Sequence, residues 1–531
     1  MRILRLTALV MVLAMAVAGC SGSSSSSSSS SDSTIRVTRD GPIVPIFHPI
    51  KATDNTYPLM YLIYDPLVSI AADEKTIEPR LAESWTVSDD ARTFTFVLRD
   101  DVTWQDGKPF TADDVVFTAT WAARFPGAYQ GQPMAWNQIA GAAEAADGAT
   151  ELSGAVAVDK KTVKLTLTEP NAGFLAQMAN APNVIVPQHL LEKETGKTLE
   201  TSKFAKKPVG TGPFKLTTYK ADQYVELAAN KDYFAGAPKT DRIIWKILSG
   251  NQIATQLESG DLDIAFGMPQ ENRSTLKNAK GVELTDNLSV GMVGLFTRTE
   301  APALKDKRVR RALYYGIDRQ ALIDKVLGGK AERLWNPPGL SLDGLETYDF
   351  DQDKARALLA DAKWDEATKL RLVYWKDAPM AGQALPIIQQ QLAEIGVKVS
   401  LNPLESDDWD DMVTNPERRG EWELDYEFGG TYGLGPDYSS AQYGTCKGNK
   451  VQTGYQNCDL ADLFVKGRSI VDPDTQAKVY REIAETINQA ADAVYLWQPY
   501  LLNGVSDSVS GVVAYPFDRH SFLKATEWSK K

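Results

Sequence analysis

The sequence contains little histidine and little cysteine, and this scarcity narrows the chemistry that the chain can support. Its 531 residues include three histidines and three cysteines. A zinc site needs about four nitrogen or sulfur ligands. The histidines lie far in the sequence from the pair formed by Cys446 and Cys458. We therefore expect no metal site, and the sequence suggests no cofactor.

The chain also lacks basic excess and the common catalytic motifs. Its 57 lysines and arginines stand against 69 aspartates and glutamates, for a net charge of −12. This balance argues against nucleic acid as a partner. No Gly-x-Ser-x-Gly elbow, His-Glu-x-x-His helix or Walker loop occurs. Gly210-Thr211-Gly212 could suggest a phosphate-binding loop, but a proline follows at once, so we interpret it as a structural turn. We therefore expect that the protein is not an enzyme. Its many carboxylates leave one alternative, an acid/base pair such as that of a glycosidase.

One apolar run stands out, and it lies at the N-terminus. A cationic start at residues 1–5 precedes an apolar stretch at residues 6–17, and Ala18-Gly19-Cys20 follows. The stretch is shorter than the ~20 residues that a membrane-spanning helix needs, which predicts a secretory signal peptide at residues 1–19. The small residues before Cys20 resemble a bacterial lipobox. That resemblance implies a lipidated Cys20, whereas in an ordinary secretory signal Cys20 would have no special role.

A serine-rich stretch follows Cys20 and predicts a flexible linker over residues 20–33. No later apolar run approaches the length of a membrane span. We therefore expect a folded body attached by lipid alone to the membrane, in the cell envelope, on the periplasmic or extracellular side. In such an exported chain, Cys446 and Cys458 enclose a short loop and predict a disulfide, with a zinc site as the alternative.

The first part of the body has a mixed pattern rich in strands. Residues 93–98 and 162–167 alternate between polar and apolar side chains, as half-buried strands do. Residues 224–227 and 242–247 predict further strands. The segment from Thr111 to Asp114 has the form of a capping box, which predicts a helix through about Ala123.

After residue 302 the pattern becomes helical. Helices are predicted around residues 309–317, from Asp318 to Gly328, around 355–359, at 385–395 and from Asp472 onward. A strand at 397–401 directly follows a helix, and strands return at 493–502 and 509–513. Alternation of helix and strand predicts an α/β domain with a partly parallel sheet. The length alone suggests about three domains.

Several blocks of the sequence share a family signature. PRLAESW occupies residues 79–85, and LRDDVTWQDGKPFTADDV occupies residues 98–115. PVGTGPF at 208–214, NKDYF at 230–234 and the segments 306–318 and 387–399 follow in order. The chain is similar to the family 5 extracellular solute-binding proteins, which are dipeptide, oligopeptide and nickel receptors of ABC importers.

The resemblance implies an α/β, two-lobe, periplasmic-binding-protein-like fold of the cluster C type, with a hinge between the lobes. The first lobe would comprise residues 34–300, with an extra subdomain at about 73–207, and would be completed by residues 492–531. The second lobe would comprise residues 301–491. The expected protein is a monomer that captures a solute between its lobes and passes it to an ABC permease and its ATPase.

The resemblance also indicates where the ligand binds. Peptide-binding relatives use an aspartate of the second lobe for the ligand's ammonium group, and Thr431 stands at the matching place. Asp437 matches a later aspartate of the family. Trp136 matches a cleft aromatic of some relatives. The segment from Phe428 to Tyr438 contains glycines, which permit a ligand to approach the backbone closely, and aromatic side chains, whose faces permit stacking. The predicted ligand-binding residues are Trp136, Phe428, Thr431, Tyr432, Asp437 and Tyr438.

Peptide is the first expectation for the ligand, followed by an oligosaccharide and then a metal chelate. An envelope hydrolase is the alternative from another functional class. Turnover of a bound sugar or peptide would indicate the hydrolase. Saturable binding without product would indicate the receptor.

Overall fold

The structure is a computed structural model. It describes residues 33–39, 41, 43, 47–49, 52, 55–124, 135–146, 152–194, 198, 201–415, 417–430 and 457–531. Cys20 and the rest of residues 1–32 lie outside these ranges. The lipidation of Cys20 therefore stays a prediction.

A large sheet forms the framework of the described chain. It has twelve strands, two of which, β12 and β14, branch from β18. β15 pairs in parallel with β16 and β17, which confirms the partly parallel sheet expected from the sequence. The main path runs in the order β16 (Lys398–Leu404), β15 (Lys369–Trp375), β17 (Leu424–Gly430), β13 (Gly291–Thr297), β18 (Ala493–Ser506), β11 (Ile264–Met268), β1 (Thr34–Arg39), β10 (Arg242–Lys246), β9 (Tyr224–Ala229) and β8 (Phe214–Lys220).

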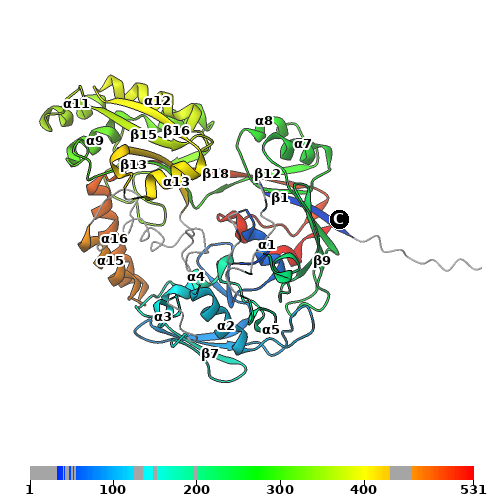
Figure 1. The fold of residues 1–531 in the computed structure, drawn as a ribbon. Coiled ribbons are helices and arrows are strands. Elements are labelled where there is room, and N and C mark those ends of the chain that lie inside the picture. The colour runs from blue at the N-terminus through cyan, green and yellow to red at the C-terminus, as the bar shows by residue number, and fades with distance from the viewer. Residues whose placement is uncertain are drawn as a thin grey trace, which may run out of the picture. The chain divides into compact units, whose positions relative to one another are not determined.

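Strand β18 belongs to both halves of this sheet. Its first part pairs with β13 and with β14 (Ala331–Arg333), and its second part pairs with β11 and β12 (Val282–Leu288). Figure 1 shows β18 extending from beside β13 to beside β12. The chain also passes directly from β12 to β13. The two halves are therefore joined through neighbouring strands.

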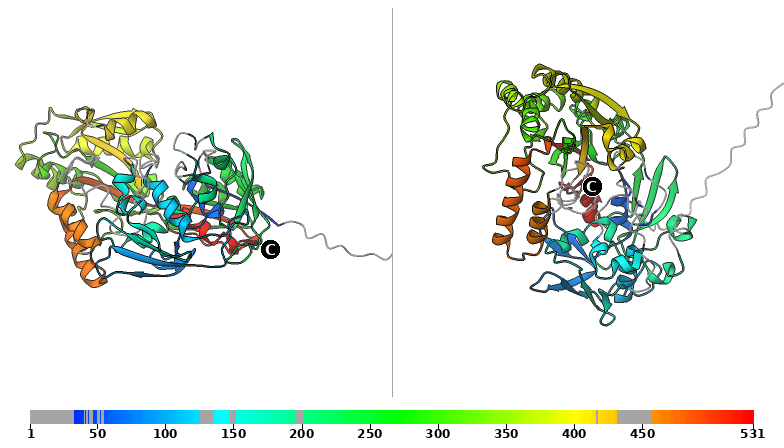
Figure 2. Two further views of the ribbon diagram at one scale, coloured as in Figure 1. Left: turned by 60° about the horizontal axis from the view of Figure 1, so that its bottom comes forward. Right: turned by 60° about the vertical axis from the view of Figure 1, so that its left-hand side comes forward.

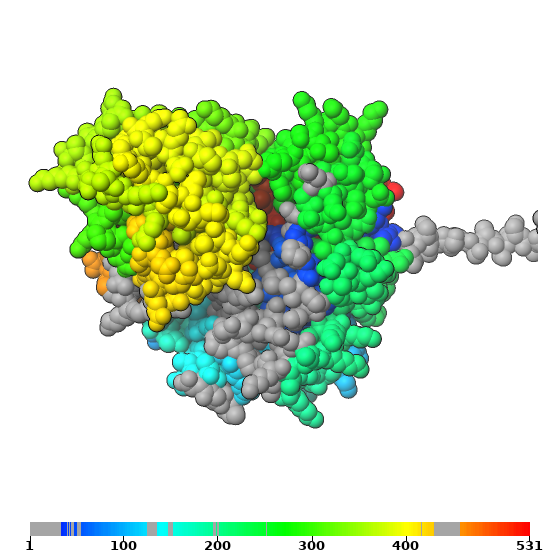
Figure 3. All heavy atoms as spheres, turned by 45° about the horizontal axis from the view of Figure 1, so that its top comes forward, coloured from blue at the N-terminus to red at the C-terminus, as the bar shows by residue number. Residues whose placement is uncertain are grey.

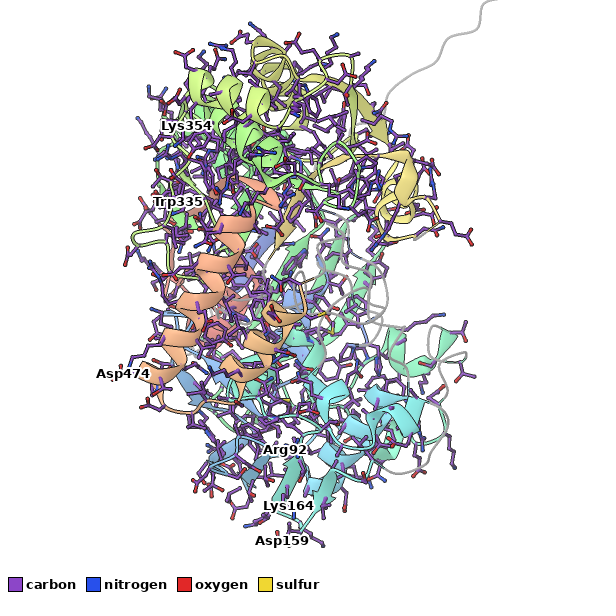
Figure 4. The ribbon with its side chains drawn as sticks, turned by 90° about the vertical axis from the view of Figure 1, so that its left-hand side faces the viewer. Arg92, Asp159, Lys164, Trp335, Lys354 and Asp474 are labelled. Atoms are coloured by element: carbon purple, nitrogen blue, oxygen red, sulfur yellow. The ribbon has the colours of Figure 1, made fainter. Side chains whose placement is uncertain are left out.

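Each half of the sheet has its own large hydrophobic core. The first core contains buried residues between positions 35 and 266 together with residues 509–528 of the C-terminal segment. The second core contains buried residues between positions 292 and 497. Figure 4 labels Trp335 and Lys354 in the part that surrounds the second core. The lobe boundaries expected from the sequence stay predictions.

Helices cover the second half of the sheet. Asp318 and Asp472 cap α10 and α16 as predicted, each accepting a backbone N–H of the first turn. Figure 2 shows α15 and α16 side by side. The helices are α9 (Lys307–Gly316), α10 (Arg319–Val326), α11 (Gln352–Asp361), α12 (Ala381–Glu394), α13 (Ser406–Thr414), α15 (Cys458–Arg468) and α16 (Pro473–Ala490), with a 3₁₀ turn at Arg419–Glu421.

A smaller sheet of four strands lies in the first half of the chain, where Figure 4 labels Asp159 and Lys164. The Thr111 capping box is present, and Thr111 N donates to Asp114 Oδ2 at 3.0 Å. The sheet runs in the order β4 (Ala82–Val87), β5 (Thr93–Leu98), β7 (Thr162–Thr166) and β6 (Ala155–Ala157), and α2 (Ala112–Ala123) packs on it.

Short elements complete the first half. The helices are α1 (Tyr57–Ile63), α3 (Ala142–Ala146), α4 (Phe174–Met178), α5 (Gln188–Leu191), α6 (Lys203–Lys206), α7 (Asn251–Ser259) and α8 (Asn272–Leu276), with 3₁₀ turns at Ala135–Gln138, Ala181–Asn183 and Asp518–Glu527. The strands β2 (Val68–Ile70) and β3 (Ile77–Pro79) pair with each other, as do β19 (Val509–Ser510) and β20 (Ser529–Lys530).

The strand predicted at residues 509–513 is shorter than expected. Gly511 ends it because this glycine has a φ of +80°, outside the strand region. A Cβ at this position would also lie 2.1 Å from the backbone oxygen of Glu527. The chain therefore turns one residue after β19.

Residues of three separate sequence blocks converge on the carboxylate of Asp65. Arg80 Nε donates to Asp65 Oδ1 at 2.7 Å, and Tyr233 OH donates to the same oxygen at 2.8 Å. Thr211 Oγ1 donates to Oδ2 at 2.9 Å. Asp65 is completely buried. Part of the sequence signature thus serves to hold one buried carboxylate.

The turn at Gly210-Thr211-Gly212 is structural, as predicted. The Gln105 side chain donates to the backbone oxygens of Gly212 and Phe214 and accepts from Gly210 N. A Cβ on Gly210 would lie 1.8 Å from the backbone oxygen of Ile63. The turn and the end of α1 therefore approach each other more closely than any side chain allows.

Replacing Gly210 by alanine is expected to lower the free energy of unfolding by about 1–3 kcal/mol, because the backbone must move to relieve this contact. Gly382→Ala is the matched control. Gly382 is on α12, where an added Cβ would meet no described atom of another element within 4 Å, and alanine favours a helix. Urea unfolding of both variants measures the difference. Equal stability of the two variants would contradict the steric argument.

Candidate functional site

A cavity of about 560 Å³ lies between elements of the two cores. Figure 3 shows the molecule hollowed between the yellow surface of the second half and the green surface of the first. The cavity is lined by Arg39, Asn55, Gly267, Met268, Pro269, Gln270, Ser289, Val290, Gly291, Val293, Leu327, Trp375, Pro379, Met380, Phe428, Trp497, Pro499, Tyr500, Leu501, Pro516, Phe517, Asp518 and Arg519.

These residues come from strand ends and from segments that follow them. Arg39 ends β1, Trp375 ends β15, and Gly267 lies near the end of β11. The connection from β12 to β13 and the middle of β18 contribute residues between the two sides. The cavity is thus built where the sheet passes from one core to the other.

Charged side chains line the wall that belongs to the first core. Arg39 Nε lies 2.5 Å from Asp518 Oδ2, and an Arg39 terminal nitrogen donates to Asn55 Oδ1 at 2.6 Å. The Arg519 guanidinium lies 4.3 Å from the centre of the Phe517 ring. These contacts hold the arginines against the wall through ionic and cation–π interactions.

Gly267 makes room for this charged group. It has a φ of +64°, and a Cβ there would lie 2.7 Å from Asp518 Oδ2. Its backbone N–H donates to Asn503 Oδ1 at 3.1 Å. A glycine is needed here because both the backbone conformation and the carboxylate exclude a side chain.

A second ionic group lies beside the cavity and connects the two halves. Asp286 of β12 accepts from Lys330 Nζ at 2.9 Å and forms an ion pair with Arg273. Burial alone would raise the pKa of Asp286, but the hydrogen bonds from Lys330 and Gln270 lower it overall. The Tyr500 hydroxyl donates to Glu332 at 2.6 Å. The Lys330–Asp286 ion pair and the Tyr500–Glu332 hydrogen bond both connect the segment around β14 to the first half.

Strand β17 runs past the end of its pairing with β15 at this site. It pairs with β13 over its whole length, from Leu424 to Gly430. Its pairing with β15 covers only Leu424, Asp425 and Tyr426. Within the described ranges, no strand pairs with the β15 side of β17 beyond Tyr426. Phe428, which lines the cavity, lies two residues beyond the end of the pairing with β15.

The structure places two of the predicted ligand-binding residues. Phe428 lines the cavity, and 40% of its surface is exposed. Trp136 is completely buried in the first core and does not line the cavity. The remaining predicted ligand residues, Thr431, Tyr432, Asp437 and Tyr438, lie outside the described residues.

The predicted disulfide is also only partly placed. Cys458 is the first residue of α15, and Cys446 lies outside the described residues. Their pairing therefore stays a prediction.

The three histidines have surroundings typical of structural residues. Burial lowers the pKa of His48 to about 3, which keeps its ring neutral. His189 Nε2 lies 2.8 Å from Asp106 Oδ2, and His520 Nδ1 lies 2.9 Å from Glu74 Oε2. Over the part of the chain that the structure describes, no group of three or more histidine, cysteine, aspartate or glutamate residues is arranged to hold a metal ion.

Sequence reasoning did not identify most of the cavity. Arg39, Trp375, Met380, Asp518 and Arg519 all line it. The adjacent charges of Asp518 and Arg519, in a C-terminal segment with many apolar residues, are the one local signal that could have suggested a site. Trp375 and Met380 carry no such signal.

The fold and site define a solute-binding protein, and comparison with known proteins gives its family. Residues 76–451 match the family described as "Bacterial extracellular solute-binding proteins, family 5 Middle". The chain belongs to this family. The family consists of extracellular solute-binding proteins. No helix within the described ranges is long and apolar enough to cross a membrane.

Individual relatives agree with this assignment. The chain is 27% identical to the oligopeptide-binding protein AppA of Bacillus subtilis, over 89% of this chain and 87% of that protein. It is 27% identical to the glutathione-binding protein GsiB of Salmonella typhimurium, over 86% and 88%. The crystal structure of the ABC transporter substrate-binding protein CtaP of Listeria monocytogenes superposes with a TM-score of 0.79 at 26% identity, covering 94% of this chain and 99% of that one. The α/β fold class of periplasmic binding proteins is confirmed.

Proposed function

We propose that the protein captures a peptide in this cavity and delivers it, chemically unchanged, to the permease and ATPase of an ABC importer. The observation that carries the proposal is the end of β17 at the cavity, where among the described strands β15 pairs with β17 only as far as Tyr426. An extended peptide can add to a strand edge through backbone hydrogen bonds, and neighbouring pockets then select its side chains.

The composition and size of the cavity support a ligand of this kind. Small-molecule sites are typically clefts of about 300–1,000 Å³, mainly apolar with a few placed polar groups. The present cavity has this size and combines apolar residues with Arg39, Asn55, Gln270 and Asp518. Relatives named for oligopeptide and glutathione binding add support from the family.

The experiment is to identify the ligand directly. Mass spectrometry of small molecules released on denaturing the purified protein is expected to detect peptides. Calorimetric titration of the ligand-stripped protein with peptide, oligosaccharide and nickel–histidine libraries is then expected to give saturable heat with peptides alone. Binding of only sugars or chelates, or conversion of a bound peptide to products, would refute the proposal.

The proposed receptor acts as a monomer held at the membrane by lipid on Cys20. Cys20→Ala is expected to release the protein from the membrane fraction with unchanged ligand affinity, because residues 20–33 separate the anchor from the cavity. A single acyl chain binds only marginally, so stable anchoring would require more than one. Membrane fractionation measures the effect, with Ser21→Ala as the control. Retention of the cysteine variant in the membrane would exclude this anchor.

A further inference from the structure

We infer that the ligand carries a large apolar side chain, and that the second-core wall of the cavity binds it. The inference deepens the proposed function, because it assumes that the ligand is a peptide and assigns the class of side chain that is selected. It rests on the difference between the two walls.

The described residues that the second core places on the cavity wall are all apolar. Trp375 and Phe428 come from the neighbouring strands β15 and β17, Val293 and Trp497 come from β13 and β18, and the others are Leu327, Pro379 and Met380. Phe428 is among the most exposed large apolar residues of the described chain, with 40% of its surface accessible. Covering this surface with an apolar group removes it from water and favours binding.

The opposite wall has a different character. It carries the charged or polar residues Arg39, Asn55, Gln270, Asp518 and Arg519 beside the apolar residues Met268, Pro269, Pro516 and Phe517. A ligand that contacts both walls therefore meets charged side chains on the first-core side and apolar side chains on the second-core side. A peptide residue suits both walls, because its backbone is polar and its side chain can be apolar.

Met380 suggests that this wall accepts several apolar side chains of the ligand and not a single type. It precedes α12 with a φ of +63°, and it lies on the wall next to Pro379. A methionine side chain is unbranched and polarizable, so it adapts to partners of different shape. Leucine, methionine and phenylalanine are the expected ligand side chains.

The experiment measures the affinity of tetrapeptide pools in which one position holds a fixed residue type and the other positions are mixed. Each of the four positions is tested in turn. The position holds leucine or phenylalanine in two pools, and serine, aspartate or lysine in the others. The leucine and phenylalanine pools are expected to bind at least about tenfold more tightly at one position. Phe428→Ala and Trp375→Ala are each expected to weaken this binding about tenfold or more, since central aromatic contacts dominate such sites.

Phe350→Ala is the matched control, because Phe350 is 44% exposed but does not line the cavity. It should leave affinity within about twofold. Phe428→Leu keeps an apolar group and should retain the preference, which guards against misfolding of Phe428→Ala. Equal affinity for all pools, tighter binding of charged pools, or intact binding in both aromatic variants overturns the inference while peptide reception stands. Failure of every peptide pool alongside binding of a sugar or chelate overturns both.

Discussion

Replacing Asp65 by alanine is expected to destabilise the protein by about 3–5 kcal/mol, the range for breaking a buried ion pair by removing one partner. The carboxylate accepts hydrogen bonds from Arg80, Thr211 and Tyr233 and has no exposed surface. Without it, the Arg80 charge loses its ionic partner, and two hydroxyl groups lose their acceptor. Urea unfolding followed by fluorescence measures the loss.

A surface ion pair provides the control for this prediction. Asp100 lies 2.6 Å from Lys161 Nζ, and both side chains are exposed. Asp100→Ala is expected to leave the free energy of unfolding nearly unchanged, because water screens such pairs. If Asp65→Ala costs no more than this control, the three contacts do not stabilise the fold. Asp65→Asn removes the charge but keeps a hydrogen-bond acceptor. Its loss of unfolding free energy should lie between the losses of Asp65→Ala and Asp100→Ala.

Asp492→Asn is expected to flatten the pH dependence of stability between about pH 4 and pH 8. Burial raises the pKa of Asp492 to about 7, and the nearby positive charge of Arg310 only partly opposes this. The folded state therefore holds a proton that the unfolded state releases near pH 4. The stabilisation of the folded state by this bound proton is fully present below pH 4 and is lost as the pH rises through 7. It amounts to about 4 kcal/mol at most, at 1.36 kcal/mol per pH unit.

The measurement is urea unfolding at pH 5, 6, 7 and 8 at constant ionic strength. Relative to the variant, the wild type should lose stability from pH 5 to pH 7, with little further loss at pH 8. Asp474→Asn serves as the control, because Asp474 is exposed on α16 and labelled in Figure 4. Parallel curves for the wild type and Asp492→Asn would show that the Asp492 carboxyl does not hold a proton in the folded state.

Local features of the fold could be predicted from the sequence because their causes are local. Asp318 and Asp472 cap helices where their positions indicated, and the alternation at residues 93–98 forms β5. These features depend on residues a few positions apart. The fold class followed from the family signature. In contrast, the partners of Asp65 come from residues 80, 211 and 233, and no sequence period connects such positions.

The site was harder to predict for the same reason. Phe428 was predicted because its segment resembles one that relatives use for ligands, and it lines the cavity. Arg39 and Asp518 lie 479 residues apart in sequence and meet only after β1 and the C-terminal segment have packed together. Trp375 resembles any strand aromatic until the sheet order is known. Cavity residues are therefore set by topology, which the sequence shows only through resemblance.

The double membership of β18 has a consequence for how the chain folds during synthesis. The strand begins at residue 493, yet it supplies pairing partners for β11, β12, β13 and β14. Neither half can complete its sheet until almost the whole polypeptide is available. Contacts between such distant positions form slowly, because a long loop must close first. A partly made chain should thus lack the strand that joins β11 to β13 until its synthesis is almost complete.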